Sequence, residues 1–364
     1  KDSNLALIGS ELDKQIKQAA AEGESAWTGV GEKPEVRVWR IEKFKVVPWP
    51  EDRYGEFHKG DSYIVINSYQ KGSSAALCHD IHIWIGAESS QDEYGTAAYK
   101  MVEADDFLGG VPVQHRQVQG REDKKFHAYF DVLEYLDGGI ESGFNHVEPD
   151  ETHPVLFQVK GTKQRMTLSQ VPVSKNSLNS GDSFILFGGK AKVWCWHGKG
   201  AKPLEKAHSN QWAERMCTMG TVTTLDENQG DEEYTEFWDI LGDGMIGEDM
   251  QDDEGVTEFE PLLYRVDGDP TKDLELVATG MPIQKTSKTC SCLNRVDLDD
   301  NDVFLIDSGW EIYVWVGKSA DRYERIAAIS AADRYSKKDP RTLELPVHIV
   351  KSGHESESFN ALFD

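Results

Sequence analysis

Long hydrophobic runs, a surplus of positive charge and catalytic patterns are all missing from this sequence. No apolar stretch approaches the roughly 20 residues that a membrane helix needs, so we expect no integral membrane association. Lysine and arginine number 39 against 64 aspartates and glutamates, which gives a formal net charge of −25. This charge argues against nucleic acid or an anionic membrane as the main partner. It permits calcium, whose protein ligands are carboxylates and carbonyls.

Cysteine is scarce as well, with five in 364 residues. The odd number and irregular spacing predict no disulfide framework. The chain also has no Asn-x-Ser/Thr acceptor, and no signal-peptide pattern opens it. These features favour a reducing compartment, so we expect a cytoplasmic protein.

Catalytic constellations are absent from the sequence too. The letters "GDGMIG" (242–247) fit a G-x-G-x-x-G loop, but no strand leads into them and the acids around them would repel a pyrophosphate. We therefore predict that the protein is not an enzyme. The alternative that stays open is a calcium-dependent hydrolase that uses the histidines of the first 150 residues. These are His79, His82, His115, His127 and His146.

What the chain does contain is a threefold internal repeat. The segments "KGDSYIVINSY" (59–69), "SGDSFILFGG" (180–189) and "DNDVFLIDSG" (300–309) each place an acid before an apolar run. A second strand-like run that ends in glycine follows each of them, and a helix-like segment comes next. Recurrence of these ordered features at one period predicts three domains, each a sheet covered by helices.

Each repeat carries two acids at matching places. One precedes the first apolar run, and the spacing between repeats is 121 and then 120 residues. The other lies near the start of the helix-like segment. If the fold brings two such carboxylates within about 4 Å, they repel by roughly 4 kcal/mol at an effective dielectric of 20. A cation would remove that cost, and the oxygen-only set without a His/Cys cluster favours calcium over zinc. The pairs are Asp61 with Glu93, Asp182 with Glu205, and Asp302 with Glu324.

The segment 91–106 predicts a helix with two apolar edges. Ser90 and Glu93 form a capping-box pattern at its start. One stripe at helical spacing can dock the helix on its own domain, and it consists of Tyr94, Ala98, Met101 and Leu108. Tyr99 and Val102 lie roughly 80–140° round the helix from this stripe. They are therefore candidate contacts for a partner, although Tyr99 can equally be an ordinary half-exposed aromatic residue.

These motifs resemble the gelsolin superfamily. The resemblance rests on the repeat and on "SQDEYGTAAYKMVEADDFLGG", "VPVQHRQVQG" and "GGIESGFNHV". The three-repeat length and "RVWRIEKFKVVPWPEDRYGEFHKGDSYIV" are most similar to the severin and fragmin branch. The resemblance implies a mixed α+β fold of three gelsolin-like repeats, each with a central mixed sheet between a long and a short helix. It also implies a cytoskeletal protein, monomeric when free, that is activated by Ca²⁺, severs actin filaments and caps their barbed ends. Capping without severing is the alternative that the sequence leaves open.

The resemblance also suggests boundaries. We predict an N-terminal extension at 1–35, repeat 1 at 36–148, a linker at 149–154, repeat 2 at 155–225, an acidic linker at 226–261 and repeat 3 at 262–364. From residue 226 to residue 260 there are fifteen acids and no lysine or arginine. Such a run is typical of a solvated connector, although "EYTEFWDILG" inside it can form a short helix.

By the same resemblance, backbone carbonyls complete the calcium sites. The first site would consist of Gly60, Asp61, Glu93 and Ile140, the second of Gly181, Asp182 and Glu205, and the third of Asn301, Asp302 and Glu324. Asp249, Asp252 and Asp253 are candidates for one further ligand of the second site. A calcium shared with actin would be held by Asp105 and by the carbonyls of Gly110 and Pro112.

Phosphoinositide binding, which is typical of the family, is expected to be weak. The first of the two basic stretches used by relatives corresponds here to "YFDVLEYLDGG" (129–139), which has no lysine or arginine. The second keeps Lys160, Lys163 and Arg165. One basic residue near a lipid surface contributes about 1 kcal/mol, so three among many acids make a weak site. A solvated edge is an equally good interpretation of this stretch.

Overall fold

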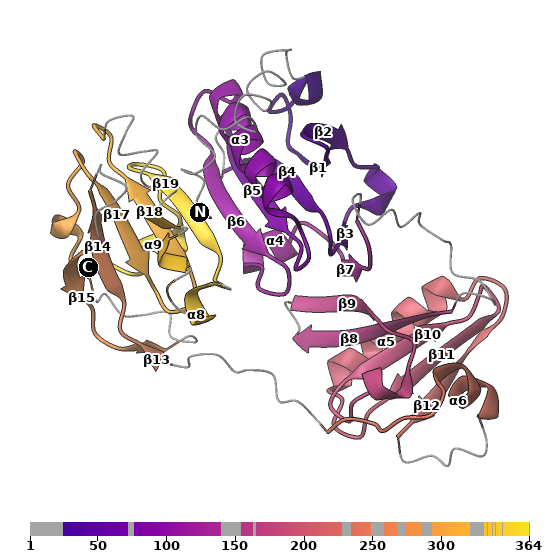
Figure 1. The fold of residues 1–364 in the computed structure, drawn as a ribbon. Helices are drawn as coiled ribbons and strands as arrows, with labels where there is room; N and C mark the ends of the chain where they lie inside the picture. The colour runs from indigo at the N-terminus through magenta and orange to yellow at the C-terminus, as the bar shows by residue number, and fades with distance from the viewer. Residues whose placement is uncertain are drawn as a thin grey trace. The chain divides into compact units, whose positions relative to one another are not determined.

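The computed structural model divides the chain into two compact units (Figure 1). The first unit contains Lys1–Asp52, Asp61–Asp123 and Gly255–Asp364, and the second contains Arg53–Gly60 and Lys124–Glu254. The structure describes residues 25–71, 76–139, 154–162, 165–227, 234–248, 258–267, 274–284, 293–320, 331–332, 334–336, 338, 340–343 and 345–363. Within these residues, no helix is long and apolar enough to span a membrane.

The first unit is built on a ten-stranded mixed sheet with the order β15-β14-β17-β18-β19-β6-β5-β4-β1-β2. Its strands are β1 (Glu35–Glu42), β2 (Lys45–Pro48), β4 (Ser62–Gln70), β5 (Leu77–Ile85), β6 (Val113–Val118), β14 (Leu262–Val266), β15 (Glu275–Thr279), β17 (Val303–Asp307), β18 (Ile312–Val316) and β19 (Val347–Lys351). The pairs β5–β6 and β18–β19 are parallel, and the other neighbours are antiparallel. The sheet therefore combines strands from the first and third repeats.

The two repeats meet where β6 pairs with β19, a junction that we call the β6–β19 seam (Figure 1). The pairing is antiparallel and short. Its register places Val347 opposite Arg116, His348 opposite His115, and Ile349 opposite Gln114. Because paired residues on neighbouring strands point to the same face of a sheet, each of these pairs brings side chains of the two repeats together.

Helix α3 (Gln91–Phe107) covers the first-repeat part of this sheet (Figure 1). The predicted capping box is confirmed, because Ser90 Oγ accepts from the Glu93 amide at 3.3 Å and Glu93 Oε2 accepts from the Ser90 amide at 3.2 Å. The face that docks is centred on Ala97, Met101 and Ala104, with Ala98 and Leu108 at its margin. It packs against the isoleucines of β4 and β5 at positions 64, 66, 81 and 83.

Part of the predicted N-terminal extension belongs to the same core. Trp27 and Val30 are buried against the first-repeat cluster. Trp27 also donates its indole N–H to Glu103 Oε1 on α3 at 3.0 Å. The extension therefore contributes to the packing of α3, at least from residue 25 onward.

The third-repeat half of the first unit has apolar clusters on both faces of its strands. Its short helices are α8 (Pro340–Leu343) and α9 (Glu357–Asn360), and a two-stranded sheet joins β13 (Glu258–Phe259) to β16 (Ile283–Gln284). In the third repeat, the helix-like segment that follows the second strand is "DRYERIAAISAADRY" (321–335), and it lies mostly outside the described residues. Residues 331, 332 and 334–336 are helical.

The second unit has a seven-stranded sheet with the order β12-β11-β10-β8-β9-β7-β3. Its strands are β3 (Glu56–His58), β7 (Leu133–Leu136), β8 (Val155–Thr162), β9 (Arg165–Val171), β10 (Ser183–Phe187), β11 (Lys192–His197) and β12 (Thr221–Asp226). Its helices are α4 (Lys124–His127), α5 (Pro203–Met216) and α6 (Thr235–Leu241). The strands β3 and β7 come from the segment predicted to form repeat 1, and β7 pairs in parallel with β9.

Helix α6 lies inside the acidic segment and confirms the short helix predicted there. Phe237 and Leu241 are buried in a cluster with Trp194 and Trp196 of β11. Thus the acidic segment does more than connect repeats, since two of its apolar residues help to build the core of the second unit. The proline-bounded linker at 149–154 lies outside the described residues except for Pro154.

Two acids face each other in the parallel pair of β3 and β7, where Glu56 is opposite Glu134. Burial and the charge of Glu56 raise the pKa of Glu134 to about 7, and Arg53 opposes both. The raised pKa means that Glu134 stabilises the fold below its unfolded pKa of about 4.5 and that this contribution is lost as pH rises toward 7.

We therefore expect hydrogen exchange in β7 to become faster between pH 5 and pH 8, after correction for the intrinsic rate. Glu134→Gln should flatten this change, because the amide does not ionise. The matched variant Glu214→Gln, at an exposed position on α5, should behave like the wild type. A pH dependence that persists in Glu134→Gln would contradict the assignment.

Candidate functional site

The first predicted acid pair is buried in the first unit. Asp61 is fully buried before β4, and Glu93 is 6% exposed in the first turn of α3. Burial raises the pKa of Glu93, the neighbouring charge of Asp61 raises it too, and hydrogen bonds from Ser89 and Ser90 lower it. The fold therefore brings both carboxylates close enough to interact electrostatically, as the repeat pattern predicts.

Arg40 and Tyr63 are the contacts of this acid pair that bear on its charge. The Arg40 guanidinium lies 3.5 Å from Asp61 Oδ2, but it also approaches Glu42 at 3.1 Å. The Tyr63 hydroxyl lies 3.4 Å from the same Asp61 oxygen. A hard divalent cation suits such an oxygen-rich, negatively charged position. Of the two other predicted ligands, Gly60 directly precedes Asp61 and Ile140 lies outside the described residues.

The second acid pair lies at the corresponding places in its repeat, with Asp182 before β10 and Glu205 at the start of α5. Glu205 is fully buried at the start of α5, and its carboxylate accepts the amide hydrogens of Gly161 at 3.1 Å and Lys202 at 2.9 Å. Burial raises the pKa of Glu205; these two hydrogen bonds and the charge of Lys202 lower it, and the charge of Asp182 raises it. The pairing of these two acids therefore agrees with the sequence prediction.

Hydrogen bonds hold the second acid of this pair, Asp182, in place. Its Oδ2 accepts from the side-chain amides of Gln158 at 2.6 Å and Asn179 at 2.8 Å. Asn179 Oδ1 in turn accepts the amide hydrogen of Gly181 at 2.8 Å. The side chain of Asp182 thus accepts from two neutral donors, whereas the Lys202 ammonium lies 3.8 Å from Glu205, the other acid of the pair. The predicted linker ligands Asp249, Asp252 and Asp253 lie outside the described residues.

The third predicted site is only half described. Asp302 forms an ion pair with Arg265, and Asn301 donates its amide hydrogen to Asp299 Oδ1 at 2.9 Å. Glu324 lies outside the described residues, so its pairing with Asp302 remains a prediction. Asp302 thus has a cation in direct contact, as Asp61 has in Arg40, whereas Asp182 accepts from neutral side-chain amides.

The predicted actin-shared site contains a lysine from the other repeat. The Lys351 ammonium, at the end of β19, donates to Asp105 Oδ1 at 3.1 Å and Oδ2 at 3.0 Å. It also donates to the Gly110 carbonyl. Two of the three groups predicted to bind calcium therefore hold an ammonium group, and Pro112, the third, is buried. Sequence reasoning missed Lys351, since no local pattern relates it to a carboxylate 246 positions away.

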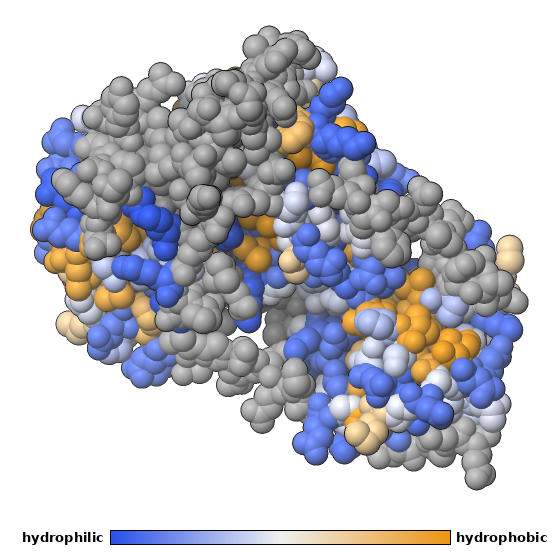
Figure 2. All heavy atoms as spheres, in the orientation of Figure 1, coloured by the Kyte–Doolittle hydropathy of each residue, from blue (hydrophilic) through white to orange (hydrophobic). Residues whose placement is uncertain are grey.

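The predicted partner-facing edge of α3 is exposed in part. Val102 is 40% exposed, and Tyr99 is partly buried. Phe107 and Val111 near the end of the helix are 53% and 44% exposed, and sequence reasoning missed both. On the face drawn in Figure 2, hydrophobic residues gather in small areas among hydrophilic ones. Exposed apolar side chains near the end of α3 therefore mark a candidate contact surface.

The predicted basic stretch falls on the β8–β9 hairpin. Lys160 is partly buried in β8, and Arg165 begins β9 opposite Thr162. Lys163 lies outside the described residues. Their arrangement as a lipid site remains a prediction.

A histidine cluster that the sequence analysis did not predict lies in the first unit, apart from the acid pairs. Ligand atoms of His82, His115 and Asp123 all lie within 4.8 Å of one another, and the three residues are buried. The sequence did hold a signal for it. His82 and His115 lie in neighbouring strands at the same register, so their side chains share one face of the sheet.

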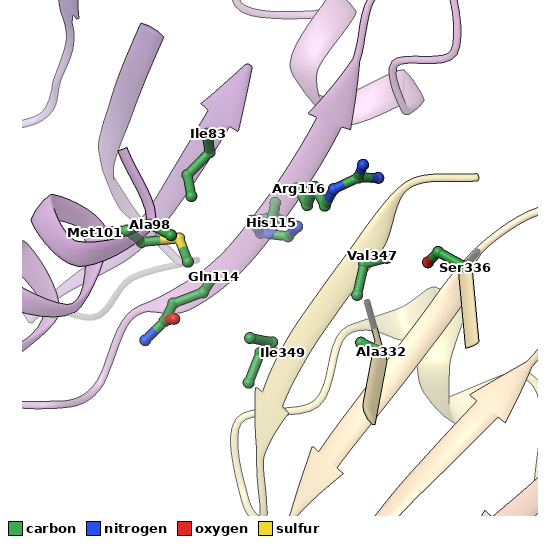
Figure 3. Close-up of a pocket in the computed structure, with 10 residues that line it drawn as sticks. All are labelled: Ile83, Ala98, Met101, Gln114, His115, Arg116, Ala332, Ser336, Val347 and Ile349. Atoms are coloured by element: carbon green, nitrogen blue, oxygen red, sulfur yellow. The ribbon is translucent and has the colours of Figure 1, made fainter. Parts of the chain in front are cut away.

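The opposite face of the β6–β19 seam contains a pocket (Figure 3). Ile83, Ala98 and Met101 of the first repeat line one side of it, and Ala332, Val347 and Ile349 of the third repeat line the other. Two buried polar atoms there, Gln114 Oε1 and Ser336 Oγ, have no hydrogen-bond partner among the described residues. Because unsatisfied buried polar atoms and empty space are both costly, the seam is imperfectly packed.

Comparison with known proteins places these features in a family. The family model described as "Gelsolin repeat" matches residues 43–126, 166–238 and 289–360. Gelsolin-like protein 1 of Lumbricus terrestris is 36% identical over 365 residues, covering 99% of this chain and 95% of that protein. Severin of Echinococcus granulosus is 33% identical over 373 residues, with coverages of 99% and 95%. These matches confirm the resemblance predicted from the repeats.

Two further matches have narrower coverage. Cytoplasmic gelsolin of Homarus americanus is 36% identical over 355 residues, which cover 93% of this chain and 45% of that protein. Among solved structures, the Thorarchaeota 2DGel3/rabbit actin complex is 27% identical over 56% of this chain, with a TM-score of 0.25. The second unit's match to the family model ends at residue 238, inside α6.

Proposed function

Because the chain belongs to the gelsolin family, we propose that it is a calcium-activated protein that severs actin filaments and caps their barbed ends. The observation that carries the proposal is the contact of Lys351 with Asp105 and the Gly110 carbonyl. A ligand set suited to a divalent cation is held by a lysine of another repeat. Capping without severing remains the second candidate, and the close similarity to severin favours severing over it.

In the structure the β6–β19 seam joins the first repeat to the third, and we call this arrangement closed. In this arrangement Lys351 neutralises Asp105 and keeps the last turn of α3 against the third repeat. An actin-facing helix that is tied in this way is not free to enter a groove on a partner. Separation of β19 from β6 is therefore the step that makes the protein active.

Calcium would add positive charge to acid pairs that the closed fold leaves with at most one nearby side-chain cation among the described residues. Asp61 with Glu93 would hold one ion, Asp182 with Glu205 a second, and Asp302 with Glu324 a third. Once Lys351 has left, Asp105 and the carbonyls of Gly110 and Pro112 form a further set of oxygen ligands that actin can complete. Oxygen ligands of this kind suit calcium.

Calcium binding at such sites can supply the free energy that separation of β19 from β6 requires. Moving a closed-to-open equilibrium from 99:1 to 1:99 takes about 5.5 kcal/mol of differential binding. Two or three ions of modest preference for the open form could supply it. The unsatisfied Gln114 and Ser336 atoms at the seam lower the cost of separating the strands, since both atoms gain water when the seam opens.

Helix α3 is the element that we propose to bind actin. Its sheet-facing side is already used by Ala97, Met101 and Ala104. The edge with Tyr99 and Val102 is then available to a hydrophobic groove, the helix-in-groove mode of recognition. The second repeat would hold the filament side while α3 enters between neighbouring subunits. The free protein is proposed to be a monomer of the cytoplasm and cytoskeleton, and the name of the Homarus americanus relative supports the cytoplasmic location.

Depolymerisation of fluorescently labelled actin filaments tests the proposal. At a low protein-to-actin ratio, filaments should shorten rapidly in micromolar to millimolar calcium and slowly in chelator. Capping alone would block subunit exchange at barbed ends without increasing the number of ends. No effect in calcium would contradict the proposed function.

Calcium should also stabilise the protein against heat. A ligand present at 100 times its dissociation constant adds about 2.7 kcal/mol per site, so the unfolding midpoint should rise by several degrees. Asp182→Asn should reduce this rise and change the midpoint in chelator little, because its amide can still accept a hydrogen bond. Equal midpoints in chelator and in millimolar calcium would contradict the assignment of the acid pairs.

Phosphoinositide should bind weakly. The stretch 129–139 lacks lysine and arginine, and only Lys160, Lys163 and Arg165 remain near the β8–β9 hairpin. Co-sedimentation with vesicles that contain phosphatidylinositol bisphosphate should recover little protein at physiological salt. Tight binding that survives the double change Lys160→Ala and Lys163→Ala would contradict this prediction.

A further inference from the structure

We propose that His115, His348 and Asp123 form a binding site for a transition-metal ion of the Zn²⁺ class at the β6–β19 seam. This site is distinct from the calcium sites in both ligand type and position. It draws one histidine from the third repeat and its other ligands from the first. Its regulatory consequence rests on the proposed function, whereas the binding of the ion does not.

Three ligand atoms already converge at this point. His115 Nδ1 lies 2.7 Å from His348 Nδ1 and 4.0 Å from Asp123 Oδ2. His348 Nδ1 lies 3.8 Å from the same Asp123 oxygen. Tetrahedral zinc with bonds of about 2.0–2.1 Å separates its ligands by about 3.3–3.4 Å. Binding would thus need the two nitrogens to move apart and the carboxylate to move closer, each by roughly 0.6 Å.

Neighbouring side chains orient the histidines for this role. Asp80 Oδ1, which is fully buried, lies 3.0 Å from His115 Nε2 and accepts its hydrogen. The His115 Nδ1 atom then presents a lone pair, to which His348 Nδ1 donates a hydrogen. A carboxylate behind a ligating imidazole is a common support in metal sites, since it fixes the tautomer and the ring orientation.

One tautomer change would free the second nitrogen. If the His348 hydrogen moves from Nδ1 to Nε2, it faces Glu311 Oε2 at 3.8 Å. Both Nδ1 atoms then present lone pairs to the same point, and no proton has to leave the site. In the structure the hydrogen between the two nitrogens therefore occupies the place that a metal ion would take.

The fourth side is also lined by suitable groups. His82 stacks on His115 with ring centroids 4.2 Å apart, and one of its ring nitrogens lies within 4.8 Å of ligand atoms of His115 and Asp123. Gln117 Nε2 donates to Asp123 Oδ2 at 2.7 Å and approaches His82 Nδ1 at 3.1 Å. The amide thus fixes the carboxylate and leaves His82 as the candidate fourth ligand.

Burial and ligand chemistry select the class of ion. His82, His115, His348 and Asp123 are each at most 5% exposed. Two or three imidazoles with one carboxylate are typical of zinc, cobalt or nickel, whereas calcium prefers oxygen ligands alone. Because His348 is paired with His115 across the seam, a bound ion would tie β19 to β6. It would oppose the opening that calcium favours.

Cobalt titration of the full-length protein tests the site. The metal-free protein should bind one equivalent of Co²⁺ with visible absorption of tetrahedral intensity, and Zn²⁺ should displace it. His348→Gln and Asp123→Asn should each weaken binding at least tenfold. The control His354→Gln, at an exposed position of the same repeat, should bind as the wild type does. Unfolding midpoints measured without metal show whether each variant folds. If one of the two variants does not fold, the other still tests the site.

Equal cobalt affinity in the wild type, His348→Gln and Asp123→Asn would overturn the site, as would the absence of stoichiometric binding. A second arm measures the calcium midpoint of severing with and without one equivalent of Zn²⁺. The wild type should need at least threefold more calcium with zinc, and His348→Gln should not. Cobalt binding that depends on His348 together with an unchanged calcium midpoint would keep the site and overturn its role against opening. Severing that is absent under all conditions would count against the proposed function, not against the metal site.

Discussion

Lys351→Met is expected to lower the calcium concentration at which the protein binds monomeric actin by tenfold or more. The variant keeps an unbranched side chain but loses the ammonium that donates to both Asp105 oxygens and to the Gly110 carbonyl. Asp105, whose side chain is 10% exposed, would then lie at the seam without its cation. Hydrogen bonds to charged groups contribute about 1.5–3 kcal/mol, which corresponds to a ten- to hundredfold shift toward the open form.

Fluorescence of labelled monomeric actin, followed against free calcium, measures this shift. Lys338→Met is the matched control, because Lys338 is an exposed lysine of the same repeat. Its midpoint should equal that of the wild type. An unchanged midpoint in Lys351→Met would mean that the lysine does not restrain opening. It would contradict our claim that the Lys351 ammonium competes with calcium for Asp105.

Val102→Asp is expected to weaken actin binding in saturating calcium by thirtyfold or more. Val102 is 40% exposed on the α3 edge that we propose to enter a hydrophobic groove. An aspartate there would have to be desolvated without a partner, and loss of a central contact in an interface costs about 2 kcal/mol or more. Because the side chain is partly in solvent already, folding and the calcium-dependent rise of the unfolding midpoint should persist.

The matched control is Val296→Asp, at a valine of the third repeat that is 82% exposed. It should bind actin as the wild type does. If Val102→Asp also bound with wild-type affinity, the exposed edge of α3 would not be the contact surface. Phe107 and Val111 near the end of the helix would then be the remaining candidates for the contact with actin.

Features that depend on the spacing of residues within one repeat could be predicted from the sequence. The helix at 91–106, its capping box and the acid pairs Asp61–Glu93 and Asp182–Glu205 all follow from spacing within one repeat, and the structure contains them. The mixed α+β fold is likewise confirmed by the three family matches. Family membership also agrees with the prediction that the protein is not an enzyme.

Contacts between repeats were beyond sequence reasoning. Asp105 and Lys351 are 246 positions apart, and only the pairing of β6 with β19 brings them together. The same pairing places His348 beside His115. The sequence of a single repeat predicts the sheet of that repeat. It gives no information on which edge strand pairs with a strand of another repeat. For the same reason, the sequence did not predict that β3 and β7 pair in the sheet of the second unit.

Composition misled the interpretation of the acidic segment in one respect. Fifteen acids over 226–260 favour a solvated connector, yet Phe237 and Leu241 are buried within α6. Two apolar side chains one helical turn apart are enough to dock a short amphipathic helix. Charge counts therefore predict solvation of the segment as a whole and not the packing of each turn.

A reversible disulfide across the seam tests the central claim most directly. Gln114 and Ile349 are register partners in the antiparallel pair of β6 and β19, where opposite Cα atoms lie about 4.5–5.5 Å apart, within the range of a disulfide. The variant that combines Gln114→Cys with Ile349→Cys would be oxidised, and breaks per micrometre of single filaments would be counted in millimolar calcium. Gln114→Cys alone, treated with the same oxidant, controls for the native cysteines. Our account predicts no severing by the oxidised double variant and full recovery on reduction. Severing at the same rate before and after reduction would contradict the claim that the seam must open.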